Sequence, residues 1–334
     1  MSFLKKTLCT VVPLCAALLL TGCHINFSVT GTKVNYTNAE KYQAGDVKIN
    51  ETVDELRIHW ISGGVELLAS ESDTVRVKET GAPADEALKL RYWLDGSTLH
   101  IQPCASGTNY PGTLNKTLTV MLPERRMDLI SVDGVSCNVE ITALEARTVS
   151  IDTVSGDAEL KGCTVADELK MDSTSGDLRA SLKGALGALN FSTVSGDAEL
   201  NGCDVTEKLK MDSTSGALTA HLRGTLDAVD FDSVSGAAKI EAEKIMRVDF
   251  DTTSGAMELN LEREPGTLNH SSTSGSLSLT LPEDADFELN FDSVSGSLKS
   301  DIPVTKSGDT YIAGSGGNEY SVDTTSGSMR IYKR

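Results

Sequence analysis

The chain has 334 residues, with 30 Lys and Arg against 48 Asp and Glu, and a formal net charge of −18 at pH 7. This acidic balance excludes nucleic acid as a natural partner, because the phosphate backbone is bound by clustered Lys and Arg. The length suits two ordinary domains or one long repeat array. Only 5% of the residues are aromatic and 29 are glycine, which favours thin β structure with many turns.

Residues 1–22 predict a lipoprotein signal peptide. A short basic segment, "MSFLKK", precedes the apolar stretch "TLCTVVPLCAALLL", which is too short to span a bilayer comfortably. The stretch ends in "LTGC" at residues 20–23, which resembles the lipobox of bacterial lipoproteins at all four positions. The resemblance implies cleavage before Cys23 and lipid attachment to its thiol. The alternative is an ordinary signal peptide that ends near a cysteine.

Anchoring through Cys23 would make the membrane a partner and place the chain outside the cytoplasm, lipid-anchored to the bacterial cell membrane. Residues 23–44 then form a lipidated N-terminus and polar tether. Residues 45–130 alternate less regularly and contain loop signals, so they are expected to form the first, irregular β turns of a solenoid.

Residues 131–334 repeat a Ser-Gly corner with a spacing of about 20. A period of this size is typical of a solenoid. The hexapeptide "MDSTSG" occurs at 171–176 and again at 211–216, which indicates duplication of a two-coil unit. The corner position is occupied by the following residues: Gly63, Cys137, Gly156, Gly176, Gly196, Gly216, Gly236, Gly255, Gly275, Gly296 and Gly327.

Within each repeat, apolar residues alternate with polar ones, as in strands with one buried face. Odd positions before the glycine are apolar, and even positions after it are apolar, so the glycine marks a bend between two strands. The pattern predicts an all-β protein, a single-stranded β-solenoid like a parallel β-helix, with coils of about 20 residues stacked about 4.8 Å apart.

The run "YQAGDVKINETVDELRIHWISGGVEL", the segment "LTVMLP", the serial "VSGD" or "TSGD" corners and a terminal "YSVDTTSGSMRIY" resemble the bacterial DUF4097 family over about residues 40–334. Proteins of that family are often described as adhesin-like and occur in the cell envelope. The resemblance implies a β-repeat fold and an envelope location. It supplies no catalytic residues and no cofactor.

No catalytic, cofactor-binding or metal-binding residue is predicted. A serine precedes nearly every corner glycine, which favours an architectural role, since a nucleophile needs a base and an oxyanion hole at one place. The five histidines show no metal-binding spacing, and His270 is expected to be a core residue with a hydrogen-bond partner.

Four cysteines remain after Cys23. Cys163 and Cys203 occupy the same position two coils apart, about 9.6 Å, and so should not form a disulfide. Both are expected to be small buried residues. Whether Cys104 and Cys137 are paired stays open.

A column of aspartates is predicted four residues before the corner, facing outward. Its repulsion could be offset by hydrogen bonds from nearby backbone, Ser and Thr groups, which we favour, or by divalent cations. The members of this column are as follows: Asp133, Asp152, Asp172, Asp212, Asp232, Asp251, Asp292 and Asp323, interrupted by Ser192 and Ser271.

These observations favour a non-catalytic, membrane-anchored envelope lipoprotein, a scaffold or adhesin-like solenoid that binds an envelope protein or a glycan. The alternative is a glycan-active β-helix enzyme, a polysaccharide lyase or hydrolase. A local cluster of carboxylates with Arg or Lys on adjacent coils would favour the enzyme. Tyr and Trp gather in 36–110 and 311–332, where they are expected to cap the ends of the core.

Overall fold

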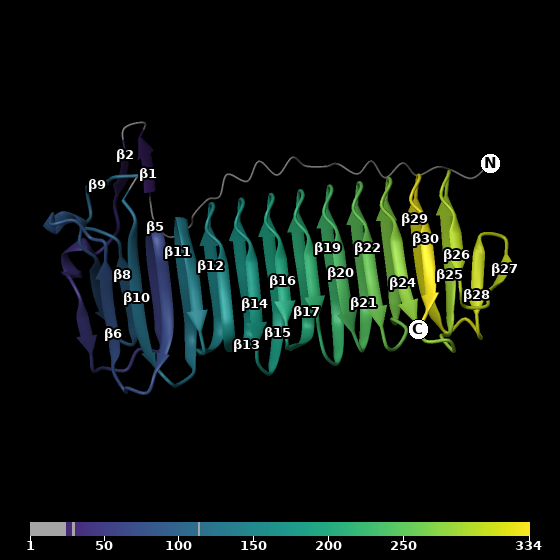
Figure 1. Cartoon of the computed structure of the whole chain (residues 1–334), viewed down its shortest axis with the longest axis horizontal. Coiled ribbons are helices and arrows are strands. Elements are labelled where there is room, and N and C mark those ends of the chain that lie inside the picture. The colour runs from purple at the N-terminus through teal and green to yellow at the C-terminus, as the bar shows by residue number, and fades with distance from the viewer. Residues whose placement is uncertain (1–24, 29–30, 113) are drawn as a thin grey trace.

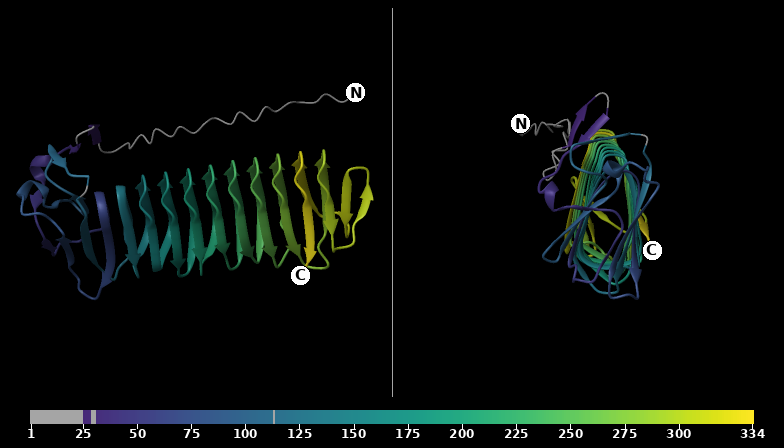
Figure 2. Two further views of the ribbon diagram at one scale, coloured as in Figure 1. Left: turned by 45° about the horizontal axis from the view of Figure 1, so that its top comes forward. Right: turned by 90° about the vertical axis from the view of Figure 1, so that its left-hand side faces the viewer.

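The protein is a rod made of stacked coils (Figure 1). The computed structural model describes residues 25–28, 31–112 and 114–334. Each coil crosses the rod twice, once before the corner glycine and once after it, so the cross-section is a flattened ring (Figure 2). The fold is therefore all-β and a solenoid, as the sequence predicts.

The strands that precede the corner form what we call the leading sheet. They pair in parallel and in register along the rod. In spatial order the sheet contains the first halves of β5 (Glu55–Ser70) and β11 (Met127–Thr142), β12 (Glu145–Thr153), the second half of β13 (Ala158–Ser173), β15 (Ala185–Thr193), β17 (Asp204–Ser213), β19 (Thr225–Ser233), β21 (Lys244–Thr252), β23 (Thr267–Ser272), β29 (Asn318–Thr324) and β25 (Phe287–Ser293).

The strands that follow the corner form the trailing sheet, which is also parallel. In spatial order it contains β10 (Lys116–Pro123), the second halves of β5 and β11, the first half of β13, β14 (Leu178–Leu182), β16 (Ala198–Asn201), β18 (Leu218–His221), β20 (Ala238–Ala242), β22 (Met257–Leu261), β24 (Leu277–Leu281), β30 (Met329–Lys333) and β26 (Leu298–Ser300).

The core lies between the two sheets and runs the length of the rod as ladders of like residues. One ladder, five residues before the corner, stacks Met211, Phe231 and Phe250, all at most 1% exposed. The rings of Phe231 and Phe250 lie 4.8 Å apart at 9°. No coil could bury its apolar side alone, so each neighbouring coil supplies the missing half of the core.

The N-terminal end differs from the irregular solenoid turns expected over residues 45–130. β5 stacks in parallel on β11 with Gly63 opposite Cys137, as the repeat predicts. β4 (Val47–Ile49) and β6 (Val75–Thr80) pair antiparallel, as do β3 (Gln43–Ala44) and β7 (Arg91–Asp95), and β7 and β8 (Thr98–Gln102). These short strands, with the 3₁₀ turns η1 (Ala39–Lys41) and η2 (Glu86–Leu88), close the exposed end of the stack.

The segment expected to be a polar tether also contains strands. β1 (Ile25–Ser28), β2 (Gly31–Val34) and β9 (Thr108–Tyr110) form a small antiparallel sheet at one corner of the N-terminal end (Figure 1). Residues 25–28 and 31–34 are thus paired to the end of the rod. We call the whole end that precedes β11, residues 25–126 as described, the N-terminal cap.

The C-terminal end is stacked in a different order from the sequence. The terminal coil, β29 and β30, lies between the coil of β23 and β24 and the coil of β25 and β26 (Figure 1). The simple repeat order, which would place the coil of Gly296 on that of Gly275, is therefore wrong. After β24 the chain first forms the outer coil, β25 and β26, and leaves one layer open. It then turns through β27 (Thr305–Ser307) and β28 (Thr310–Ala313) and returns to form β29 and β30 in that open layer.

Candidate functional site

The corner glycines are required by close approach of one coil to the next. A Cβ placed on Gly176 would lie 2.0 Å from the carbonyl oxygen of Gly156, and one on Gly196 would lie 2.0 Å from that of Gly176. Any side chain at these positions would separate the coils and break their hydrogen bonds. The glycine column is therefore the seam along which the rod is stacked.

The hydroxyl groups of the corner complete this seam. The Ser or Thr three residues before the glycine is turned toward the interior and accepts a hydrogen bond from the glycine N–H, for example at Thr153, Thr193 and Thr252, with N···O distances of 2.8–3.0 Å. The serine directly before the glycine donates to a carbonyl of the preceding coil. Such donors are Ser155, Ser215, Ser235, Ser254, Ser274, Ser295 and Ser326.

This arrangement explains the letters of "MDSTSG". The methionine enters the core, the first serine satisfies the glycine N–H, and the second serine ties the corner to the coil before it. The corner hydroxyls are thus engaged with main-chain groups. They support the architectural role predicted for the serines.

The aspartate column exists as predicted and stands in register along the leading sheet. Asp133 pairs with Asp152, and Asp152 with Asp172; further along, Asp212, Asp232 and Asp251 are consecutive. Burial, reinforced by the neighbouring carboxylates Asp133 and Asp172, raises the pKa of Asp152 to about 6. Burial is likewise the main reason that the pKa values of Asp232 and Asp251 are raised.

The compensation that we expected is seen in part. Ser271 forms a hydrogen bond with Asp251, whereas the corner Ser and Thr groups described above bond to the backbone. Lysines two residues earlier on the same face instead pair with the column, Lys170 Nζ with Asp172 at 2.5 Å and Lys210 Nζ with Asp212 at 2.6 Å. At the N-terminal end of the column, His59 Nδ1 lies 3.1 Å from Asp133. Among the described residues, no group of three or more His, Cys, Asp or Glu is arranged to hold a metal ion.

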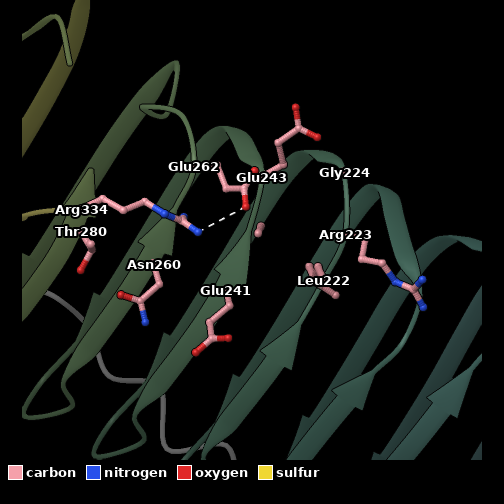
Figure 3. Close-up of a pocket in the computed structure, with 10 residues that line it drawn as sticks. Leu222, Arg223, Gly224, Glu241, Glu243, Asn260, Glu262, Thr280 and Arg334 are labelled. Carbon is pink, nitrogen blue, oxygen red and sulfur yellow. Dashed lines mark hydrogen bonds and ion pairs between the residues drawn. The ribbon is translucent and has the colours of Figure 1, made fainter. Parts of the chain in front are cut away.

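A polar hollow of about 570 Å³ lies on the outer side of the trailing sheet (Figure 3). It is built at the turns that follow β18, β20 and β22, and Arg334 reaches it from the end of β30. The charged and amide side chains that line it are Arg223, Glu241, Glu243, Asn260, Glu262 and Arg334. Sequence reasoning missed this hollow because Arg334 reaches it only through the inserted terminal coil.

The hollow is a cluster of carboxylates and arginines on adjacent coils, the feature taken to favour a glycan-active enzyme. Its charges pair with one another and with their surroundings: Arg334 Nη2 lies 3.3 Å from Glu262, and His221 Nδ1 lies 2.9 Å from Glu241. The hydrogen bond from His221 holds the pKa of Glu241 below its usual range. A glycosidase acid must remain protonated near neutral pH, so Glu241 is unsuited to that role.

His270 is a core residue, as expected. The ring is 2% exposed, and neither nitrogen makes a hydrogen bond of ordinary geometry, although the backbone of Gly275 lies close enough to raise the pKa of the ring weakly. It stacks on Phe250 at 5.2 Å and 14°, and its other neighbour is Val322 of the inserted coil rather than Phe291. Burial lowers the pKa of His270 to about 4, so the ring is neutral at physiological pH.

The four cysteines of the described chain are buried free thiols, with no bridge between Cys163 and Cys203 or between Cys104 and Cys137. Burial raises the pKa of Cys137 to about 12 and that of Cys104 to about 11, so neither is a reactive thiolate. The predicted lipidation residue, Cys23, lies outside the described residues. No helix among residues 25–28, 31–112 and 114–334 is long and apolar enough to cross a membrane.

The aromatic residues near the two ends play two roles. Trp60, Tyr110 and Tyr320 are buried and fill the ends of the core, as expected. Trp60 also packs under the buried ion pair of Lys116 and Glu79, with Lys116 Nζ 4.8 Å from its ring centroid. Tyr36, Tyr42, Tyr92 and Trp93 are instead half-buried on the surface of the N-terminal cap.

The fold and the corner chemistry define a class of protein, a parallel two-sheet solenoid stacked on glycine corners and closed at both ends by antiparallel strands. The sequence profile of the Toastrack DUF4097 family matches residues 53–264 and 228–332. The chain therefore belongs to the Toastrack DUF4097 family.

Two solved structures are similar to this chain. One is of a candidate adhesin from Bacteroides fragilis, at 16% identity and a TM-score of 0.40, and the match covers 68% of this chain and 97% of that one. The other is of a candidate cell adhesion protein from Clostridium sporogenes, at 10% identity and a TM-score of 0.20, covering 87% of this chain and 100% of that one. No curated protein matches the sequence.

Proposed function

We propose that this chain is a non-catalytic, adhesin-like lipoprotein of the bacterial envelope, anchored through lipid on Cys23, whose rigid rod presents a surface to a partner. The observation that carries the proposal is the seam of the rod. The hydroxyls that recur in the sequence bond to the main chain, so the repeated motif supports length and stiffness.

The charge of the rod supports a role in presentation. Residues 131–334 contain 34 acidic and 17 basic residues, and the aspartate column follows the leading sheet. A long acidic surface keeps a protein soluble beside anionic envelope polymers and steers basic partners toward it. The hollow beside Arg334 offers paired carboxylates, guanidinium groups and an amide to a polar partner.

Anchoring is tested with the Cys23→Ala variant in the full-length chain. The parent should incorporate labelled palmitate and sediment with membranes, whereas Cys23→Ala should be released or remain an unprocessed precursor. A variant that is still processed, labelled and membrane-bound would contradict the anchor.

The absence of catalysis is tested separately. The purified parent should release no new reducing or unsaturated ends from envelope polysaccharides. Release that is abolished in Glu241→Gln and Glu262→Gln, but retained in the surface control Glu207→Gln, would favour the glycan-active enzyme.

A further inference from the structure

We propose that the surface of the N-terminal cap around Trp93 is seated in the headgroup region of the membrane that carries the lipid anchor, so that the rod projects away from the bilayer. This inference rests on the proposed anchoring at Cys23. The partner is the phospholipid interface, with its mixture of apolar chain ends, hydrogen-bonding groups and phosphates.

The first observation is a continuous cluster of half-buried aromatic rings at the end of the rod. Tyr36 contacts Tyr42 at 4.8 Å between centroids, Tyr42 contacts Trp93 at 5.6 Å, and Trp93 stacks on His100 at 5.0 Å. We call these four residues the aromatic cluster. Aromatic rings with a polar edge are suited to a membrane interface, where one side is apolar and the other is wet.

The second observation is the position of the cluster in the fold. Trp93 lies on β7, which pairs with β3 on one side and with β8 on the other, and β8 pairs with β5. β3, β7 and β8 therefore extend the leading sheet beyond β5, at the end of the rod opposite to β27 and β28 (Figure 1). The cluster lies at one extremity of a long molecule.

The third observation is the distance along the chain to the anchor. One residue separates Cys23 from the start of β1 at Ile25, and β1 is joined through β2 to β9 in the same cap. The segment that follows β2 is held to the cap, since the Tyr36 hydroxyl donates a hydrogen bond to the carbonyl of Cys104 at 2.6 Å. A lipid on Cys23 would therefore hold the cap, rather than the middle of the rod, against the bilayer.

Charge supports the same orientation. The cap, residues 25–126, contains 13 acidic and 11 basic residues, whereas residues 127–334 contain 35 acidic and 17 basic residues. An anionic membrane surface attracts basic groups and repels acidic ones within a Debye length. The cap is nearly neutral and carries Lys41 over the ring of Trp93 at 4.5 Å, so it can approach headgroups that the acidic rod avoids.

The same contacts favour a lipid interface over a sugar ligand. A sugar stacks on an open aromatic face, but the Trp93 ring is stacked on His100 and has the Lys41 ammonium group over it. Lys41 is exposed and Trp93 is half-buried, which matches side chains that reach toward headgroups.

The test uses the full-length lipidated protein in vesicles whose phospholipids carry bromine, a quencher of tryptophan fluorescence, on the upper part of the acyl chain. The chain contains only Trp60 and Trp93. We expect bromolipid to quench the parent, and we expect this quenching to be lost in Trp93→Phe. As a matched reporter, Val294→Trp places an indole at an 84% exposed position near the far end of the rod, and its added fluorescence should not be quenched.

The outcomes separate this inference from the proposed function. Protein that floats with vesicles but shows no Trp93-dependent quenching, or quenching at position 294 instead, would overturn the inference and leave the anchor intact. Verified lipidated protein that does not float would overturn the anchor and the inference together. A shift of Trp93 fluorescence by soluble envelope oligosaccharide, with no bromolipid quenching, would identify a glycan platform and overturn the inference.

Discussion

At the scale of the residue, the glycine column is the most demanding feature of the chain. Gly196 has the carbonyl oxygen of Gly176 where a Cβ would be, and Gly216 has that of Gly196. At Gly196 and Gly216 the constraint comes from the neighbouring coil and not from an unusual backbone angle, because neither glycine has positive φ. A methyl group here cannot be accommodated by a side-chain movement.

Replacing Gly196 with Ala should therefore destabilise the protein by about 4 kcal/mol or more, within the severe class of single substitutions. The measurement is chemical denaturation followed by circular dichroism. Gly112→Ala is the control, because no atom lies within 4 Å of its added Cβ. If both variants unfold at the same denaturant concentration, the coils are not stacked as closely as described.

His270 gives the protein a pH-dependent weakness. Its pKa is lowered by burial from 6.5 to about 4 in the folded protein. Between these pH values the unfolded chain binds a proton at His270 that the folded chain does not. The contribution of the neutral His270 ring to the free energy of unfolding is therefore full above about pH 6.5 and is lost as the pH falls toward 4. The difference between the two pKa values corresponds to about 3 kcal/mol.

The His270→Phe variant should continue the aromatic ladder and remove this weakness. Its advantage over the parent in free energy of unfolding should grow as the pH falls from 7 to 4.5, since contributions from Asp152 and other groups cancel in the comparison. An advantage that is the same at both pH values would show that His270 titrates normally.

At the scale of the element, the return of the chain is held by one carboxylate. Asp286 Oδ1 accepts hydrogen bonds from the backbone N–H groups of Ser315, Gly316 and Gly317 at 2.6–3.0 Å, and Oδ2 accepts one from the Ser315 hydroxyl. Gly314 and Gly316 have positive φ, which lets the loop wrap around the acid. These donors lower the pKa of Asp286, so the contact persists at neutral pH.

Asp286→Ala should loosen β29, which directly follows this loop. We expect faster amide hydrogen exchange in residues 318–324 and a lower melting temperature, with the coils of β15 to β21 unchanged. Asp284→Ala, two residues away and exposed, should behave like the parent. Equal exchange of β29 in the two variants would mean that the loop does not hold the inserted coil.

The sequence predicted the elements well where the repeat is strict. The alternation and the glycine corners fix the register from Cys137 to Gly275, and Gly63 aligns with Cys137 as expected. It did not predict the order of the last coils, because Val322, Asp323 and Thr324 of β29 fit beside either neighbour. The order is decided by a loop contact, that of Asp286, which leaves no periodic signal.

The candidate site shares this limit. The aspartate column follows from spacing alone, and its partners Lys170 and Lys210 lie two residues earlier on the same strands. The hollow at Arg334 instead depends on which side chains meet across coils. The cap escaped prediction for a related reason: antiparallel edge strands such as β3 and β4 are only two or three residues long and carry little alternation.

At the scale of the whole molecule, the rod should tolerate removal of whole coils. Deleting residues 177–216 joins Gly176 to Ala217 and puts Leu218 where Leu178 was, facing the same inward ladder. The product should fold cooperatively into a rod shorter by two strand spacings, about 9.6 Å. Small-angle X-ray scattering measures the change in length.

Deleting residues 177–206 is the matched control, because it removes fewer residues but breaks the register. It would place Lys208 at the inward position of Leu178 and bury an unpaired charge. We expect this shorter deletion to misfold. If this shorter deletion folds, the stack does not require whole coils of about 20 residues.

The position of β29 and β30 also sets the order in which the molecule can be finished. A ribosome makes the chain from its N-terminus, so coils up to β24 can stack in the order of their synthesis, but the layer between β24 and β26 is made last. A chain cut short after residue 300 lacks an interior layer rather than its tip. Residues 301–334 therefore supply an interior layer of the stack, and the two sheets become continuous from β24 to β26 only after these residues have been added.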